Sequence, residues 1–484
     1  MRIRSEPYLI GGLLILLFLM GSLSTSPLVV GYGHDREIFR YVGMMMTQGG
    51  IPYLDAIDNK PPAIFILHAL GHMLSPGPWG SFLVMKLVGV LALISLFQAA
   101  RQTLSPRLSF LLCSLWISWI TYDKILEGGG LSRELVAYLS TVILVVIFQG
   151  KRSFGVGLQV GLLVNLIFYT QQNEILAMIP LLIYLIVIGR RIQWRVLYGC
   201  MVGGLVVHLI TLGGLGYVGA LEAFWEQCFQ FNTQLYFPEQ TLLSRIDAFF
   251  TEVLFGQKRF MVFYPVFLLS VFPLGEWFWR KQVLSPRYVS LIAALFLQLF
   301  SSSLSGWTYA HYFLAWVPLW VGLLWHMLFR LDQLWLKISL FTYLGIFLLL
   351  KVGVFSQATS YQHNPDIFQQ LQSVRGQKGQ VYTFQTSYLA YNSDLAIMSP
   401  SPYVLSHYFR FEGFDPTGEK FDQLLADIDR ANCQFIFHNP HPLIVFAPLY
   451  EDKLQAFLEN KYEEIFHVED GPILYRRKPY TYKD

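Results

Sequence analysis

The sequence predicts an all-α polytopic membrane protein with about 11 transmembrane helices, interfacial helices on the outer face and a small C-terminal α/β soluble domain. Hydrophobic residues make up 54% of the 484 residues and charged residues only 14%, well below the quarter that is usual in soluble domains. Apolar runs of about 17–22 residues recur, which is the length that crosses a bilayer core of about 30 Å. The formal net charge of +3 comes from scattered residues, which argues against a nucleic-acid partner.

The membrane part, residues 1–355, contains the expected spans. They are centred on residues 8–29, 81–99, 106–121, 133–149, 155–171, 174–189, 196–217, 260–279, 288–304, 312–329 and 336–355. The first segment follows a basic N-terminus and has the order of a signal peptide, but its apolar run is long and no A-x-A site follows it. An uncleaved first span is therefore the favoured interpretation.

Lysine and arginine occur in every second short connection, as the positive-inside rule requires of cytoplasmic loops. These basic residues are Arg2, Arg4, Arg101, Arg107, Lys151, Arg152, Arg190, Arg191, Arg195, Arg280, Lys281, Arg287, Arg330 and Lys337. The pattern predicts a multi-pass protein of a bacterial-type plasma (inner) membrane, with a cytoplasmic N-terminus and an extracytoplasmic C-terminus. It also places the loop at residues 31–80 on the outer face.

The first half of this loop, "HDREIFRYVGMMMTQGG", has the apolar spacing of an amphipathic helix that ends at Gly49 and Gly50. We expect this helix to lie along the membrane surface. Asp35 and Glu37 fall in its first turn, where the helix macrodipole stabilises a carboxylate. Such a carboxylate is suited to accept a proton, although Glu37 also fits a solvated surface.

The second half of the loop, "DNKPPAIFILHALGHML", begins another apolar helix after Pro61 and Pro62. Asp55 and Asp58 precede this helix, where carboxylate oxygens can cap its N-terminus. Lys60 is expected at the membrane rim, either to bind substrate phosphate or to extend towards lipid headgroups.

Together these residues resemble the first outer loop of the GT-C glycosyltransferases of the protein mannosyltransferase and aminoarabinose transferase type (glycosyltransferase family 39-like). The residues that carry the resemblance are Asp35, Tyr41, Gly43, Gly49, Gly50, Pro52, Tyr53, Asp55, Asp58, Lys60, Pro61 and Pro62. Three later segments also resemble outer-face motifs of that family: "EGGGLSRELVAYL" with Glu134, "FYTQQNEILAMIP", and "GWTYAHYFLAWVPLW" with His311, Tyr312 and Pro318.

The resemblance implies the GT-C fold and a hexosyl- or pentosyltransferase activity. Such enzymes move a sugar from a polyprenyl-phosphate carrier on the outer leaflet to a hydroxyl of a protein, lipid or glycan acceptor. It implies Asp35 as general base, with Glu37 as a second catalytic candidate. The residues it implies for donor phosphate and substrate are Tyr53, Asp58, Lys60, Arg133, Glu134, His311 and Tyr312. The resemblance implies a lipid-linked sugar donor and no certain cofactor. A divalent metal stays open but has no support in the sequence, because the outer carboxylates lack the ligand spacing of a divalent-metal site.

Some features depart from the family pattern or fit another function. Gln171, Gln172 and Asn173 stand where relatives often carry a basic residue, and amides cannot neutralise a phosphate. The amphipathic segment 222–240 suits acceptor selection or membrane-surface packing. Glu134 fits a purely structural pair with Arg133 or Lys124 equally well. A lipid or sugar transporter or flippase would need ionisable residues near midspan, where Lys86 and His208 are the isolated candidates. A non-catalytic membrane scaffold is the third alternative.

From about Ser356 the composition becomes more polar. The segments "QVYTFQTS", "FDQLLADIDRANCQFIFHN" and "EDKLQAFLENKYEEIFHVEDGPILYRR" predict alternating strands and helices. Residues 356–484 are thus expected to form a small extracytoplasmic α/β domain. No glycine-rich turn follows a strand there, which argues against a dinucleotide-binding role, and the spacing of the four cysteines predicts no disulfide framework.

Overall fold

A computed structural model describes most of the chain. The described residues are 6–31, 33–188, 191–234, 241–251, 284–304, 309–330, 345, 362–384, 386–404, 408–409, 412–438, 448–467 and 473–479. The chain packs as two compact units. The first unit comprises residues 1–30, 83–214 and 238–360, and the second comprises residues 31–82, 215–237 and 361–484.

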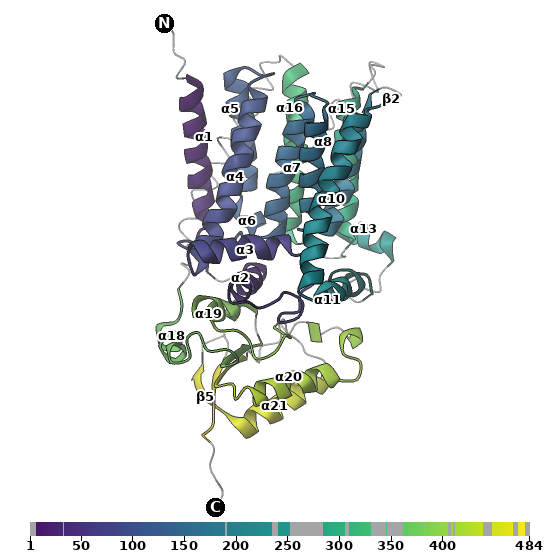
Figure 1. The fold of residues 1–484 in the computed structure, drawn as a ribbon. Helices are drawn as coiled ribbons and strands as arrows, with labels where there is room; N and C mark the ends of the chain where they lie inside the picture. Colours follow the sequence, from purple (N-terminus) through teal and green to yellow (C-terminus); the bar gives the residue numbers. More distant parts are fainter. Residues whose placement is uncertain are drawn as a thin grey trace, which may run out of the picture. The chain divides into compact units, whose positions relative to one another are not determined.

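The first unit is a bundle of apolar helices that run side by side (Figure 1). Its helices are α1 (Glu6–Ser22), α4 (Pro78–Ala100), α5 (Pro106–Ile120), α7 (Ser132–Phe148), α8 (Phe154–Phe168), α9 (Ile175–Ile186), α10 (Trp194–Tyr217), α15 (Pro286–Ser303) and α16 (Val317–Arg330). Nine of the expected spans overlap these helices, whereas 260–279 and all of 336–355 except residue 345 lie outside the described residues. Pro7–Thr25, Pro78–Ala100 and Trp194–Tyr217 are long and apolar enough to cross a membrane.

Helices α8 and α10 pack with their backbones in close contact through pairs of glycines spaced four residues apart. A Cβ atom on Gly157 would lie 2.1 Å from the carbonyl oxygen of Val196, and one on Gly161 would lie 2.2 Å from that of Cys200. Gly199 and Gly203 of α10 approach α8 as closely. Such small-residue spacing is typical of helix association in membranes, where van der Waals contact replaces the hydrophobic effect.

The second unit contains the two helices expected in the first loop, α2 (His34–Thr47) and α3 (Ala63–Leu74). Helix α2 ends where the sequence predicts, before Gly49, whose φ of 86° favours glycine. Its packing differs from the expectation of a surface helix. All residues from Arg36 to Met45 are buried, because α2 contacts α3 along one side and also contacts α19 (Leu389–Asp394). Protein therefore encloses α2, which leaves it no broad face for water.

Close contact between α2 and α3 depends on Gly43. A Cβ atom at this position would lie 2.6 Å from the backbone nitrogen of Ala69 and 2.7 Å from the carbonyl carbon of His68. Because backbone atoms cannot move aside as a flexible side chain can, any larger residue would separate the two helices. Gly43 thus fixes the spacing of the helix that carries Asp35.

A four-stranded sheet forms the rest of the second unit. Its order is β3 (Val381–Thr383), β4 (Phe435–His438), β6 (Ile473–Arg477) and β5 (Tyr462–His467). Strands β3 and β4 are parallel and the other pairs are antiparallel. The unit's remaining principal helices are α18 (Pro365–Gln372), α20 (Glu419–Arg430) and α21 (Pro448–Lys461).

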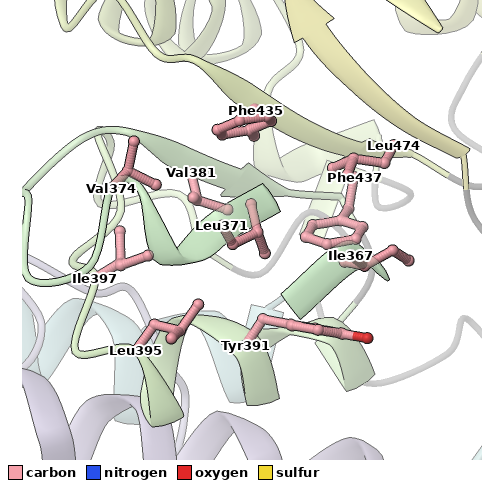
Figure 2. Packing of buried hydrophobic residues seen from close by; sticks show 10 residues of the cluster. All are labelled: Ile367, Leu371, Val374, Val381, Tyr391, Leu395, Ile397, Phe435, Phe437 and Leu474. Carbon is pink, nitrogen blue, oxygen red and sulfur yellow. The ribbon is translucent and has the colours of Figure 1, made fainter. Parts of the chain in front are cut away.

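Alternate strand residues on one face of the sheet pack against α18 and α19, as Figure 2 shows. These strand residues are Val381, Phe435, Phe437 and Leu474. Their partners on the helices include Ile367, Leu371, Tyr391 and Leu395. The packed sheet supports α19, which in turn contacts α2.

Candidate active site

Asp35 lies in the first turn of α2 and is half-buried. The residue before the helix is Gly33, whose extended backbone provides no side-chain cap for the free amide groups. The exposed positive end of the helix dipole therefore faces the Asp35 region and favours a negative charge there. The neighbouring His34 is held by a 2.5 Å contact between its Nδ1 atom and Oγ1 of Thr386.

Residues 51–60, which we call the acidic loop, connect α2 to α3 and form a tight turn. Tyr53 adopts a φ of 72°, a conformation that is unfavourable for a residue other than glycine. Its amide donates to the carbonyl oxygen of Ala56 at 2.9 Å, and the Asp55 carboxylate accepts from the amide of Ile51 at 2.8 Å. Strained backbone of this kind is concentrated at functional sites.

Asp58 is the buried carboxylate of the acidic loop, with 2% of its surface exposed. One of its oxygens accepts a hydrogen bond from the Lys60 amide at 2.8 Å. Burial raises the pKa of Asp58 to about 7, the Lys60 amide and charge oppose the rise, and the charge of Asp35 adds to it. Asp58 therefore interacts electrostatically with both Asp35 and Lys60.

The expectation that Asp55 or Asp58 caps α3 is wrong. Pro62 occupies the N-cap position and no side chain bonds to the first amides of the helix. Both carboxylates instead accept amide protons from within the acidic loop, because the turn folds back before the chain reaches the two prolines. Tyr53 completes the loop by donating its hydroxyl proton to the carbonyl oxygen of Lys60 at 2.9 Å.

A helical segment at residues 221–234, which we call the bracing helix, holds the acidic loop in place. It consists of α11 (Leu221–Trp225), a single π-helical turn (Glu226–Gln230) and α12 (Phe231–Gln234). Gln227 donates to the carbonyl oxygen of Tyr53 at 2.8 Å and accepts from the Asp58 amide at 3.1 Å. The Asn59 side-chain amide donates to Oδ1 of Asn232 at 2.9 Å, and the Asn232 side-chain amide donates to the backbone carbonyl oxygen of Asn59 at 3.0 Å.

These contacts reveal a role for the bracing helix that sequence reasoning missed, because the segment suggested only acceptor selection or membrane packing. The only available signal was its cluster of amide residues, since asparagine and glutamine both donate and accept.

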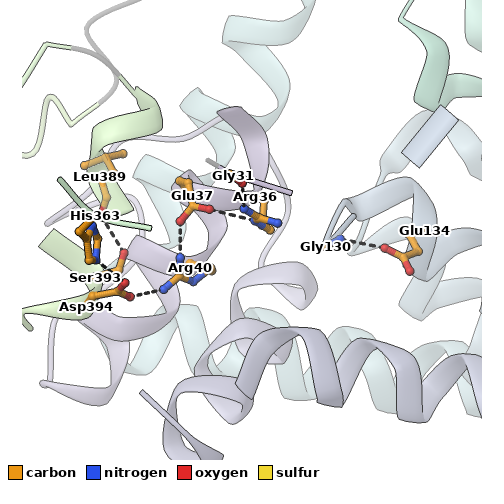
Figure 3. Close-up of polar contacts among 10 residues, drawn as sticks. All are labelled: Gly31, Arg36, Glu37, Arg40, Gly130, Glu134, His363, Leu389, Ser393 and Asp394. Carbon is orange, nitrogen blue, oxygen red and sulfur yellow. Dashed lines mark hydrogen bonds and ion pairs between the residues drawn. The ribbon is translucent and has the colours of Figure 1, made fainter. Parts of the chain in front are cut away.

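Glu37 is completely buried, so the expectation of a solvated surface residue is wrong. Its two oxygens form ion pairs with Arg36, at 2.9 Å, and with Arg40. Arg40 also pairs with Asp394, which receives a further contact from His363 at 2.8 Å (Figure 3). Both oxygens of Glu37 are thus engaged, whereas Asp35 on the same helix turn is only half-buried.

The predicted residues Arg133 and Glu134 belong to the first unit, where they begin α7. Glu134 is fully buried and forms an ion pair with Lys86. It also accepts from the hydroxyl of Tyr138 at 2.7 Å and from the amide of Gly130 at 2.8 Å. This partner differs from the pairing with Arg133 or Lys124 that the sequence suggested, because Lys86 of α4 packs beside the start of α7.

Lys86 and His208 are not isolated, contrary to the expectation from the sequence. Lys86 neutralises Glu134, and His208 contacts the hydroxyl of Tyr169 through its Nδ1 atom at 2.7 Å. Buried charges in a bundle of this kind need such partners because an uncompensated charge is costly to desolvate.

Arg133 forms a second ion pair, with Glu174, at 3.1 Å. Its guanidinium carbon also lies 3.4 Å from the ring centroid of Tyr312, a cation–π contact. The neighbouring His311 lies 2.6 Å from a carboxylate oxygen of Glu127 through its Nδ1 atom. The structure therefore links Arg133 to Tyr312 and gives His311 an acidic partner.

Gln171 and Asn173, which lie just before α9, connect helices to one another. Gln171 accepts a hydrogen bond from Ser132 at 3.1 Å. Asn173 donates to the carbonyl oxygen of Ser301 at 3.2 Å, and the Ser301 hydroxyl donates back to the carbonyl of Asn173 at 2.9 Å. Within the described ranges, no group of three or more His, Cys, Asp or Glu side chains is arranged to hold a metal ion.

Comparison with solved structures identifies a similar fold over nearly the whole chain. The structure of ArnT from Cupriavidus metallidurans in the apo state aligns with a TM-score of 0.62 and 13% identity, covering 97% of both chains. The same protein bound to undecaprenyl phosphate aligns with a TM-score of 0.65 and 12% identity, covering 96% of this chain and 97% of that one. No protein-family model and no curated protein sequence matches the chain.

Proposed function

We propose that this protein, which has the fold of the GT-C glycosyltransferases, is itself a membrane glycosyltransferase. It takes a sugar from a polyprenyl-phosphate carrier and transfers it to an acceptor hydroxyl on the extracytoplasmic face. Two observations support a lipid-linked donor. The chain contains apolar helices long enough to cross a membrane, and the similar ArnT structure holds undecaprenyl phosphate.

The grouping of Asp35, Asp58 and Lys60 is the observation that supports this reaction most directly. Asp35 is half-exposed at the start of α2, which suits a base that must reach the acceptor proton. Lys60 supplies positive charge for the phosphate that leaves. Asp58 has a pKa near 7, so it carries a proton for part of the time and limits the repulsion between the two carboxylates.

In the proposed reaction the acceptor oxygen attacks the anomeric carbon of the donor sugar. The acceptor's proton passes to the Asp35 carboxylate. The bond between the anomeric carbon and the phosphate oxygen breaks, and its electron pair leaves with the polyprenyl phosphate. Glu37 holds the two arginines of α2 and thereby positions Asp35. The assignment of Tyr53, Arg133, Glu134, His311 and Tyr312 to substrate contacts stays a prediction from the family resemblance.

The test measures sugar transfer from a panel of polyprenyl-phosphate sugars by the purified protein in lipid. Asp35→Asn preserves the shape of the side chain but removes the base, so we expect transfer to fall at least about 100-fold. Asp366→Asn is the matched control, because Asp366 is an exposed carboxylate in the first turn of another helix, α18. Equal transfer by wild type and Asp35→Asn would remove Asp35 from the mechanism. Failure of every donor with the wild-type protein would contradict the proposed activity.

A further inference from the structure

A cavity of about 340 Å³ lies wholly within the second unit, beside Asp58. Its size falls within the range of small-molecule sites, roughly 300–1,000 Å³. Its lining comes from residues 57–59 of the acidic loop, from the bracing helix, and from Tyr403, Tyr408, Phe414 and Lys420. None of the contacts described above fills this cavity.

One wall of the cavity presents amide side chains with hydrogen-bonding capacity to spare. Gln227 and Asn59 are already bonded to the acidic loop and to Asn232. Gln230 and Gln234 are exposed on the same helix, and their side-chain amides make no hydrogen bond to any part of the chain that the structure describes. Each amide can donate and accept. The π-helical turn at Glu226–Gln230 adds a residue to this wall, and such turns are frequent at functional sites.

Aromatic residues also line the cavity. Phe231 and Tyr408 lie with ring centroids 4.7 Å apart, and Phe414 lies 5.5 Å from Tyr408. Tyr403 extends the group at 6.3 Å from Phe414. An apolar lining of this kind suits the C–H groups of a sugar ring, while the free amides suit its hydroxyl groups.

The charges around the cavity argue against an anionic ligand. Asp58 and Glu226 both line it and would repel a phosphate or carboxylate. Lys420 also lines the cavity, but its ammonium group already donates a hydrogen bond to the carbonyl oxygen of Phe414 at 2.5 Å. Free amides and aromatic rings suit an uncharged ligand that is rich in hydroxyl groups. The carboxylates of Asp58 and Glu226 disfavour an anionic one.

We propose that this cavity, beside Asp58, binds a neutral saccharide unit of the acceptor. The role as acceptor rests on the proposed function, whereas saccharide binding itself does not. The site would make a glycan the acceptor class, because the residues that recognise a sugar ring lie next to the carboxylate that neighbours Asp35.

The first experiment measures ligand binding to the full-length protein in nanodiscs by saturation-transfer NMR. The probes are methyl glycosides of common neutral hexoses, pentoses and N-acetylhexosamines, together with a serine-containing tripeptide and inorganic phosphate. We expect saturation of at least one glycoside, and a loss of affinity of about tenfold or more in the double variant Gln230→Ala/Gln234→Ala, which removes the two free amides. Thr233→Ala is the control, because Thr233 bonds only to its own helix backbone and does not line the cavity.

Glycoside binding that is equal in the wild type, the double variant and Thr233→Ala would overturn the proposed site. Binding of the tripeptide or phosphate with no glycoside bound would overturn the ligand class. A separate measurement, hydrolysis of polyprenyl-phosphate sugars by the wild-type protein without acceptor, reports on the proposed function. If glycosides bind through Gln230 and Gln234 while no donor is consumed, the proposed function fails and the saccharide site stands.

Discussion

The buried carboxylate of Asp58 should make the stability of the second unit fall as the pH rises. The pKa of Asp58 is about 7 in the folded protein, against 3.8 for an ordinary aspartate. Between these two pH values the folded state binds the proton more tightly than the unfolded state. The free energy of unfolding therefore decreases as the pH rises from about 4, and the loss is complete above about pH 7. The difference between the two pKa values corresponds to about 4 kcal/mol.

The variant Asp58→Asn isolates this effect. Its amide oxygen can still accept the hydrogen bond from Lys60, but the side chain does not ionise. We expect the variant to gain stability relative to wild type by up to about 4 kcal/mol between pH 4 and pH 8. Apparent unfolding temperatures at several pH values measure the difference. Infrared spectroscopy provides a direct readout, because a band from a protonated carboxyl group should disappear as the pH rises through about 7 and should be missing in the variant.

Asp366→Asn serves again as the control, because Asp366 is exposed and its replacement should leave the pH dependence unchanged. If Asp58→Asn and wild type show parallel unfolding temperatures from pH 4 to pH 8, then Asp58 does not hold a proton near neutrality. The account of the two interacting carboxylates would then be wrong.

Two further predictions concern buried ion pairs. Replacing Glu37 by Gln removes the buried carboxylate that pairs with both Arg36 and Arg40, and leaves Arg40 only its pair with Asp394 among these contacts. The second unit should therefore lose about 3–5 kcal/mol of stability, seen as a lower unfolding temperature. An unchanged temperature would show that the loss of Glu37 is compensated by other partners of the arginines. Replacing Lys86 by Met leaves Glu134 uncompensated and should cost about the same. Combining it with Glu134→Gln should restore most of the loss in a double-mutant cycle, whereas purely additive losses would contradict the pairing.

The sequence by itself determined most of the helical structure. The length of an apolar run and the residues that cap it act locally, so they need no knowledge of the rest of the fold. Ser105 and Ser285 illustrate this, since each accepts a hydrogen bond from the first turn of its helix and is followed by proline. The end of α2 before Gly49 was predictable for the same reason.

Which residues make up the candidate site was also predictable in part, because Asp35 of α2 and Asp58 and Lys60 of the acidic loop lie within one short segment that resembles a known motif. The electrostatic environment of these three residues was not predictable. The pKa of Asp58 depends on its burial, and much of that loop is held by Gln227 and Asn232, which lie more than a hundred residues away in the chain.

Only the tertiary structure decided which charges are paired. Glu37 and Asp35 occupy the same helix turn, and periodicity gave no reason to bury one and leave the other half-exposed. Arg40 meets Asp394 across 354 positions of sequence, and Lys86 meets Glu134 across 48. A charge is stabilised by whichever opposite charge the folded chain places beside it when both leave water. Which charges are paired therefore depends on how distant segments pack, and no local sequence pattern predicts that packing.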